Sequence, residues 1–151
     1  MTTIHFDPYS AVLETLRSGL GRAAAIAQGS AEAARSPRLT VVCFADDWAP
    51  PALATAAALE AVRSSGEVQG FAQLLLIDMS EERNHAWECG IVTTPALTFH
   101  WDGEPVLITR PDWEDDYKMY GALSTERLLE IIRHARDCCC KDGPLMLALD
   151  F

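Results

Sequence analysis

Two short apolar segments, separated by one helix-forming segment, limit most strongly what this chain can fold into. Residues 39–44 read LTVVCF and residues 72–78 read AQLLLID, and each run has the length of a buried strand. The alanine-rich residues 52–63 lie between them and follow Pro50 and Pro51, which a first helical turn tolerates. The order strand, helix, strand predicts an α/β fold.

The second half of the chain adds antiparallel pairing. Asp102 and Gly103 tolerate positive φ and suit a two-residue hairpin turn, and Ser124 suits a helix N-cap. The remaining elements are predicted as helices over residues 9–20, 82–89 and 124–136 and strands over residues 96–101 and 104–109. The sequence therefore predicts a central mixed sheet flanked by helices.

The length of 151 residues fits one domain. Residues 21–38 are rich in Ala, Ser and Gly without a wide apolar stripe, which predicts an insertion, either a weak helix or a loop. Residues 142–151 form a C-terminal extension with the apolar run LMLAL. Each large apolar side chain gains about 1.5–3 kcal/mol on burial, so we expect this extension to pack on the domain or on a partner.

Charge and hydropathy narrow the function classes. The formal net charge is −10, which opposes unaided binding to a phosphate backbone, so any contact with RNA is expected to be indirect. Apolar runs are shorter than the roughly 20 residues of a membrane span, and no secretory signal is recognisable at the N-terminus. We therefore expect an intracellular protein with no membrane partner.

The five cysteines do not have the spacing of a disulfide framework. Reduced thiols are expected, and the sequence leaves a disulfide between Cys43 and Cys89 open. Consecutive side chains at Cys138, Cys139 and Cys140 diverge by about 100° on a helix and cannot converge on one metal. We expect no metal, no cofactor and, since the four histidines are scattered, no catalytic constellation.

One spacing in the chain reads Ile77-Asp78 and then Gly90-Ile91-x-x-x-Pro95-Ala96-Leu97-x-Phe99-x-x-Asp102-Gly103. This spacing resembles the thioredoxin family. The resemblance implies a thioredoxin-like fold across residues 1–151 and a cis peptide bond before Pro95. It places the active-site tryptophan at Trp48.

In the same alignment, this chain lacks the residues that carry out the chemistry of that family. The two redox cysteines would fall on Ala49 and Ala52, and the buried acid is replaced by Cys43. Thiol–disulfide exchange needs a nucleophilic and a resolving thiol, so we expect no oxidoreductase of the usual kind and no enzyme.

Three local matches carry a narrower resemblance: Asp47-Trp48-x-Pro50, the strand end Ile77-Asp78, and the C-terminal region, which includes the extended loop over residues 110–120 and ends at Phe151. These matches resemble the Dim-type thioredoxin-like proteins of the spliceosome, the family of the fifteen-kilodalton U5 protein. The resemblance implies a nuclear interaction protein of the U5 snRNP and tri-snRNP in pre-mRNA splicing. Its partners would be U5 and tri-snRNP proteins.

The candidate binding residues are Trp48, Pro50, Pro95, Trp113, Tyr117 and Phe151. Trp48 and Pro95 favour a structural role in any thioredoxin-like fold, because an indole packs loops, and only exposure of Trp48 would favour binding. Trp113 and Tyr117 are either a partner anchor or loop residues folded onto the domain. Two other functions stay open: a residual redox protein using Cys89 or the cysteine trio, and a chaperone-like accessory protein.

Overall fold

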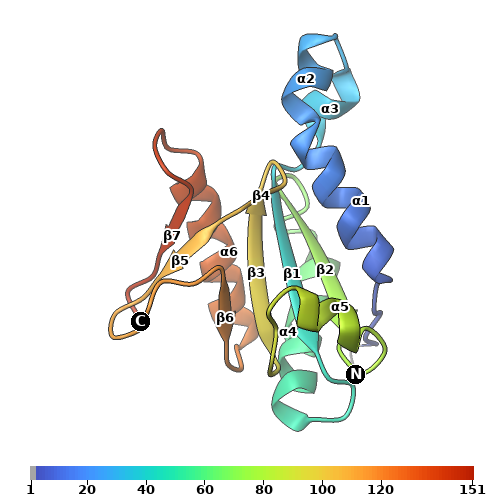
Figure 1. Cartoon of the computed structure of the whole chain (residues 1–151), viewed down its shortest axis with the longest axis vertical. Coiled ribbons are helices and arrows are strands. Elements are labelled where there is room, and N and C mark those ends of the chain that lie inside the picture. The colour runs from blue at the N-terminus through green and yellow to red at the C-terminus, as the bar shows by residue number, and fades with distance from the viewer. Residues whose placement is uncertain (1–2) are drawn as a thin grey trace.

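The computed structural model describes residues 3–151 and has three layers, with a central sheet between two layers of helices (Figure 1). The strands of the sheet are β1 (Leu39–Ala45), β2 (Ala72–Asp78), β3 (Ala96–Trp101), β4 (Glu104–Pro105) and β6 (Lys118–Tyr120). Their order is β2-β1-β3-β4, and β6 also pairs with β3. β1 is parallel to β2 and antiparallel to β3. The sequence prediction of a mixed α/β sheet is confirmed.

Both faces of β1 are buried, which explains its unbroken apolar sequence. Val41 and Cys43 belong to the larger core, under α4 (Pro50–Ser65) and α6 (Thr125–Cys139). Val42 and Phe44 belong to the smaller core, under α1 (Tyr9–Leu20) and α5 (Arg83–Glu88). No helix in residues 3–151 is long and apolar enough to cross a membrane.

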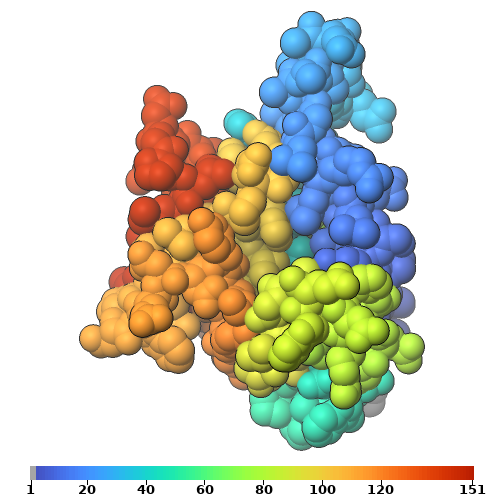
Figure 2. All heavy atoms as spheres, viewed as in Figure 1, coloured from blue at the N-terminus to red at the C-terminus, as the bar shows by residue number. Residues whose placement is uncertain are grey.

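Residues 21–38, predicted as an insertion that is either a weak helix or a loop, form two short helices, α2 (Arg22–Ala27) and α3 (Ala31–Arg35). The Ser30 side chain caps α3 by accepting from Ala33 N at 3.1 Å, which supplies the helix start. Neither helix has a buried residue, and both extend beyond the end of the sheet (Figures 1 and 2). Alanine propensity therefore makes helices here without a large apolar face.

The hairpin predicted at Asp102 and Gly103 is confirmed, with φ of 50° and 83°. Glycine is required at the second position, because a Cβ there would lie 2.4 Å from the carbonyl oxygen of Leu16 on α1. The helix therefore packs directly against the turn.

The single strand predicted over residues 104–109 is wrong. β4 ends at Pro105, which has no N–H to donate, and the chain leaves the edge of β3 after Val106, whose N still donates to the Phe99 carbonyl oxygen at 2.9 Å. β5 (Leu107–Thr109) instead pairs in parallel with β7 (Met146–Ala148) in a second sheet. The loop expected over residues 110–120 ends in β6, which takes the free edge of β3.

The C-terminal segment packs on the domain, as the sequence predicted. Leu147 is fully buried and Leu149 is 8% exposed, and both join the core under α6. α6 therefore lies between the central sheet and the β5–β7 sheet (Figure 1). The extension is part of the core.

The N-terminal segment is fixed to the outer strand β2 through Asp7, whose N donates to the Leu76 carbonyl oxygen at 2.7 Å. Asp7 Oδ2 accepts from Leu76 N at 2.9 Å and from Arg63 at 2.8 Å. Arg63 also donates to Glu60, whose side chain is 7% exposed. Burial alone would raise the pKa of Glu60, but hydrogen bonds from Arg63 and His5 lower it.

Candidate binding edge

The strand register gathers four loops at one edge of the sheet. Ala45 at the end of β1 pairs with Asp78 at the end of β2, and Phe44 pairs with Ala96 at the start of β3. Ala96 also pairs with Tyr120 at the end of β6. The segments following β1, β2 and β6 therefore meet the segment preceding β3, and we call this the strand-end edge.

Hydrogen bonds join these loops to one another. Thr94 Oγ1 donates to Asp46 Oδ2 at 2.6 Å, and Ser80 Oγ donates to Asp47 Oδ1 at 3.1 Å. Gly121 N donates to the carbonyl oxygen of Pro95 at 3.2 Å. The strand-end edge is therefore a connected surface in which each loop is positioned by its neighbour.

Pro95 follows a cis peptide bond from Thr94, as the sequence predicted. The proline is buried directly before β3, where its missing N–H costs no ladder bond. Val92 of the same loop is 65% exposed. The Thr94–Asp46 hydrogen bond connects this loop to the loop that carries Trp48.

Trp48 does not pack the loop. Its side chain is 70% exposed, so the structural role favoured by the sequence is wrong for this residue. Pro50, also exposed, is the first residue of α4, where its fixed φ suits a helix start. Trp48, Pro50 and Pro95 therefore lie at the same edge, with an apolar indole facing solvent.

Known proteins resemble this chain in structure more than in sequence. No family model and no curated protein sequence matches it. Among solved structures, a mutant thioredoxin from Halobacterium salinarum NRC-1 is 22% identical, with a TM-score of 0.47 over 66% of this chain and 76% of that one. Mitochondrial thioredoxin 3 from Saccharomyces cerevisiae, in its oxidised form, is 18% identical, with a TM-score of 0.48 over 66% of this chain and 80% of that one.

The topology itself decides the fold. A mixed sheet in the order β2-β1-β3-β4, helices on both faces and a cis proline directly before β3 form the arrangement that the sequence resemblance implies. The chain has a thioredoxin-like fold. Function has to be argued from the residues at the strand-end edge, because one fold hosts many functions.

The residues at the thioredoxin-like active-site position carry no sulfur. Ala49 occupies the N-cap position of α4 without a side-chain hydrogen bond, and Ala52 is fully buried in the first turn of the helix. Pro50 and Pro51 also remove two of the amide N–H groups with which a helix N-terminus stabilises a thiolate. Behind this turn, burial raises the pKa of the Cys43 thiol to about 12, so it stays protonated at neutral pH.

Two other candidate residues form a separate group around Arg110. The Arg110 guanidinium lies 4.8 Å from the ring centroid of Trp113 and 5.7 Å from that of Phe151. Arg127 of α6 lies 4.4 Å from the centre of the Phe151 ring, and Arg110 Nε donates to the Phe151 carbonyl oxygen at 3.1 Å. Phe151 is half-buried and fixed in place, whereas Trp113 remains 62% exposed.

The six candidate residues therefore do not form one site. Trp48, Pro50 and Pro95 share the strand-end edge, Trp113 and Phe151 contact Arg110, and Tyr117 lines a cavity beside α1. Sequence reasoning missed Asp46 and Thr94, whose polar side chains next to strand ends were the only signal. It also missed Arg110, whose guanidinium contacts the rings of both Trp113 and Phe151.

The cysteines are free thiols, so the disulfide between Cys43 and Cys89 is not formed. Cys43 lies in the core under α4 and α6, whereas Cys89 is exposed after α5 on the opposite face. Cys138 Sγ lies 3.5 Å from His134 Nε2. Across residues 3–151, no three His, Cys, Asp or Glu side chains are grouped so as to hold a metal ion.

Proposed function

We propose that this chain is a redox-inactive thioredoxin-fold interaction protein that binds a protein partner at the strand-end edge. The observation that carries the proposal is the exposed Trp48, in a loop that is hydrogen-bonded to the cis-Pro95 loop and is followed by Ala49 and Ala52 where thiols would be required. Such a loop keeps a surface for peptide binding and lacks the groups for exchange.

The exposed indole gives the proposal its energetic basis. A tryptophan side chain offers about 150–250 Å² of surface, and aromatic residues of this kind are enriched among interface residues that dominate binding energy. Asp46 and Thr94 fix the two loops on either side, so little conformational freedom is lost on binding. The edge is a preorganised surface.

The partner we propose is a protein of the U5 snRNP or tri-snRNP, which makes this chain a nuclear component of the spliceosome. Support comes from the sequence Asp47-Trp48-x-Pro50 and from the C-terminal segment that closes the fold after α6. The net charge of −10 favours a protein partner over direct contact with RNA. We also propose that the chain has no enzymatic activity.

Affinity purification of the tagged full-length protein tests both the strand-end edge as the binding surface and the spliceosomal proteins as the partners. We expect U5 proteins and U5 RNA to co-purify with the wild type and to be reduced at least tenfold with Trp48→Ala. Trp113→Ala is the matched control, since Trp113 is also exposed but lies in the other aromatic group.

The outcomes separate the general proposal from the specific one. Recovery of a stable partner that depends on Trp48 but lacks U5 proteins and U5 RNA contradicts the spliceosomal assignment alone. Loss of the partner with Trp113→Ala and not with Trp48→Ala contradicts the strand-end edge as the binding surface.

A further inference from the structure

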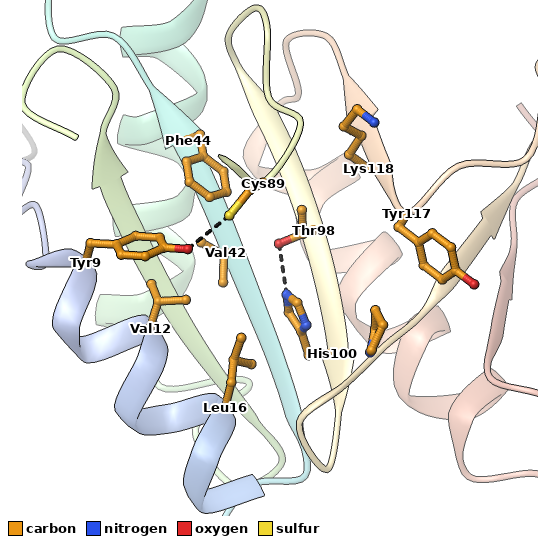
Figure 3. A pocket seen from close by; sticks show the side chains of 11 residues that line it. Tyr9, Val12, Leu16, Val42, Phe44, Cys89, Thr98, His100, Tyr117 and Lys118 are labelled. Carbon is orange, nitrogen blue, oxygen red and sulfur yellow. Dashed lines mark hydrogen bonds between the residues drawn. The ribbon is translucent and has the colours of Figure 1, made fainter. Parts of the chain in front are cut away.

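α1 lies over one face of the central sheet and leaves space on two of its sides. On one side, β3 has no helix over it within residues 3–151, and an apolar cavity lies over Val42 and Phe44 (Figure 3). A second cleft, of about 320 Å³, lies between α1 and the first residues of β1 and β2. None of Trp48, Pro50 and Pro95 lines this second cleft, so it is separate from the strand-end edge.

Polar side chains form most of the lining of the second cleft, which we call the polar cleft. α1 contributes Glu14, Thr15 and Ser18, which lie on one side of the helix at spacings of one turn. The strands contribute Thr40 of β1 and Gln73 of β2, which are paired in the parallel ladder. Among the described residues that line the polar cleft, none is aromatic. Its ligand is therefore recognised by hydrogen bonds and not by ring stacking.

Thr40 carries a nearly buried hydroxyl that opens into the polar cleft. The residue is only 5% exposed, and its Oγ1 forms no hydrogen bond with the rest of the described chain. In residues 3–151 the only side-chain polar atoms that are both sealed and unpaired are Arg22 Nε and His100 Nδ1. Thr40 Oγ1 is therefore not sealed, and the space it opens into is the cleft that Thr40 lines. A hydroxyl in this position offers a donor and an acceptor to a ligand.

The charges at the polar cleft do not select an ion. Arg38, which also lines the cleft, donates from Nη2 to Asp102 Oδ2 at 2.6 Å, and this ion pair offsets its charge. Glu14 is exposed, and an exposed carboxylate holds a cation only weakly in water. The same carboxylate and the net charge of −10 disfavour an anion. These charges favour a neutral ligand.

The remaining lining groups and the size specify the ligand further. Thr15, Ser18 and Gln73 form no side-chain hydrogen bonds within the described chain, and their hydroxyl and amide groups both donate and accept. A cavity of about 150 Å³ accommodates one benzene ring, so a cleft of about 320 Å³ accommodates a six-carbon ring with a hydroxyl group on each carbon. We propose that the polar cleft binds a neutral polyol of monosaccharide size, with one hydroxyl group hydrogen-bonded to Thr40 Oγ1.

Titration of the full-length protein with myo-inositol, followed by amide chemical shifts in NMR spectra, tests the proposal. We expect saturable shifts in α1 and at the starts of β1 and β2, with the millimolar affinity typical of a ligand of about twelve non-hydrogen atoms. Cyclohexanol has the same ring with a single hydroxyl group and should bind at least fivefold more weakly. Inositol monophosphate should also bind at least fivefold more weakly, because it is an anion. No saturable shift with myo-inositol, or equal or tighter binding of either other compound, would overturn the proposal.

A substitution at Thr40 tests the assigned hydrogen bond. Thr40→Val keeps the shape of the side chain and removes its hydroxyl, so the affinity for myo-inositol should fall about threefold or more. Thr93→Val makes the same change at an exposed residue outside the polar cleft and should leave the affinity unchanged. An unchanged affinity in folded Thr40→Val contradicts the assigned hydrogen bond.

A second pair of variants assigns the binding to the polar cleft. Ser18→Trp places an indole in the cleft and should abolish binding of myo-inositol. Leu13→Trp, on the exposed side of the same helix, should leave binding unchanged. Full binding by folded Ser18→Trp would place the ligand elsewhere. If Ser18→Trp does not fold, the comparison of Thr40→Val with Thr93→Val decides.

Discussion

Thr94 Oγ1 donates a hydrogen bond of 2.6 Å to Asp46 Oδ2 and thereby connects the cis-proline loop to the loop that carries Trp48. The two residues are 48 positions apart in sequence, and each sits where a strand of the central sheet begins or ends. This contact fixes the relative position of the two loops that form the proposed binding edge.

Replacing Thr94 by valine should loosen that edge. The variant removes one side-chain hydrogen bond, which contributes about 0.5–1.5 kcal/mol, or somewhat more when one partner is charged. We expect a small fall in the free energy of unfolding in urea and a clear loss of the co-purifying partner. Thr93→Val changes the exposed neighbouring residue in the same way and should affect neither measurement.

Disulfide reductase activity should be absent. Ala49 and Ala52 provide neither the attacking nor the resolving thiol, and burial keeps Cys43 protonated. In an insulin-reduction assay with dithiothreitol as the reductant, the rate should equal the uncatalysed rate. A faster rate that disappears in Cys89→Ser would show instead that the exposed thiol after α5 acts as a nucleophile.

The C-terminal strand should be essential for stability. Leu147 is fully buried in the core beneath α6, so Leu147→Ala should reduce the free energy of unfolding by about 2–5 kcal/mol. Truncation after Lys141 removes Leu147 and Leu149 together and should cost more, with loss of any partner. Asp150→Ala alters an exposed residue of the same segment and should leave the melting temperature unchanged. Equal melting temperatures for the truncated and full-length chains would contradict a structural role of this strand.

Acid should destabilise the fold in two steps. The pKa of His100 falls from 6.5 in the unfolded chain to about 4 in the folded one, so the unfolded chain binds the proton first as the pH decreases. The free energy of unfolding therefore decreases as the pH is lowered from 6.5 to 4. The total decrease is at most about 3 kcal/mol. Glu60, whose folded pKa is lowered, adds a further loss below its ordinary pKa of 4.5.

Urea unfolding at several pH values measures this loss. His100→Gln removes the first titration and should flatten the curve between about pH 6.5 and 4.5. An unchanged slope in His100→Gln would show that another group causes the first loss.

Local sequence signals were sufficient for most elements because each signal acts within a few residues. The apolar run of β1, the turn residues Asp102 and Gly103 and the cap Ser124 each specify a local conformation, and the structure contains all three. The helix at residues 22–27 was only weakly signalled, because alanine supplies propensity without a large apolar face.

Only the tertiary structure decided the features that are formed by residues far apart in the chain. Residues 104–109 have the pattern of one strand, but they divide at Pro105 because β7 offers Leu107 a parallel partner, Met146, from the far end of the chain. The fold likewise places the Tyr9 hydroxyl 2.9 Å from Cys89 Sγ, and no local sequence pattern encodes this contact. The sequence by itself determined the order β1-α4-β2-α5-β3-β4 and the loss of both redox thiols, since these depend on neighbouring residues and on residue identity. The exposure of Trp48, the splitting of the sheet and the open face of β3 depend on which elements meet in space, and packing alone determines that.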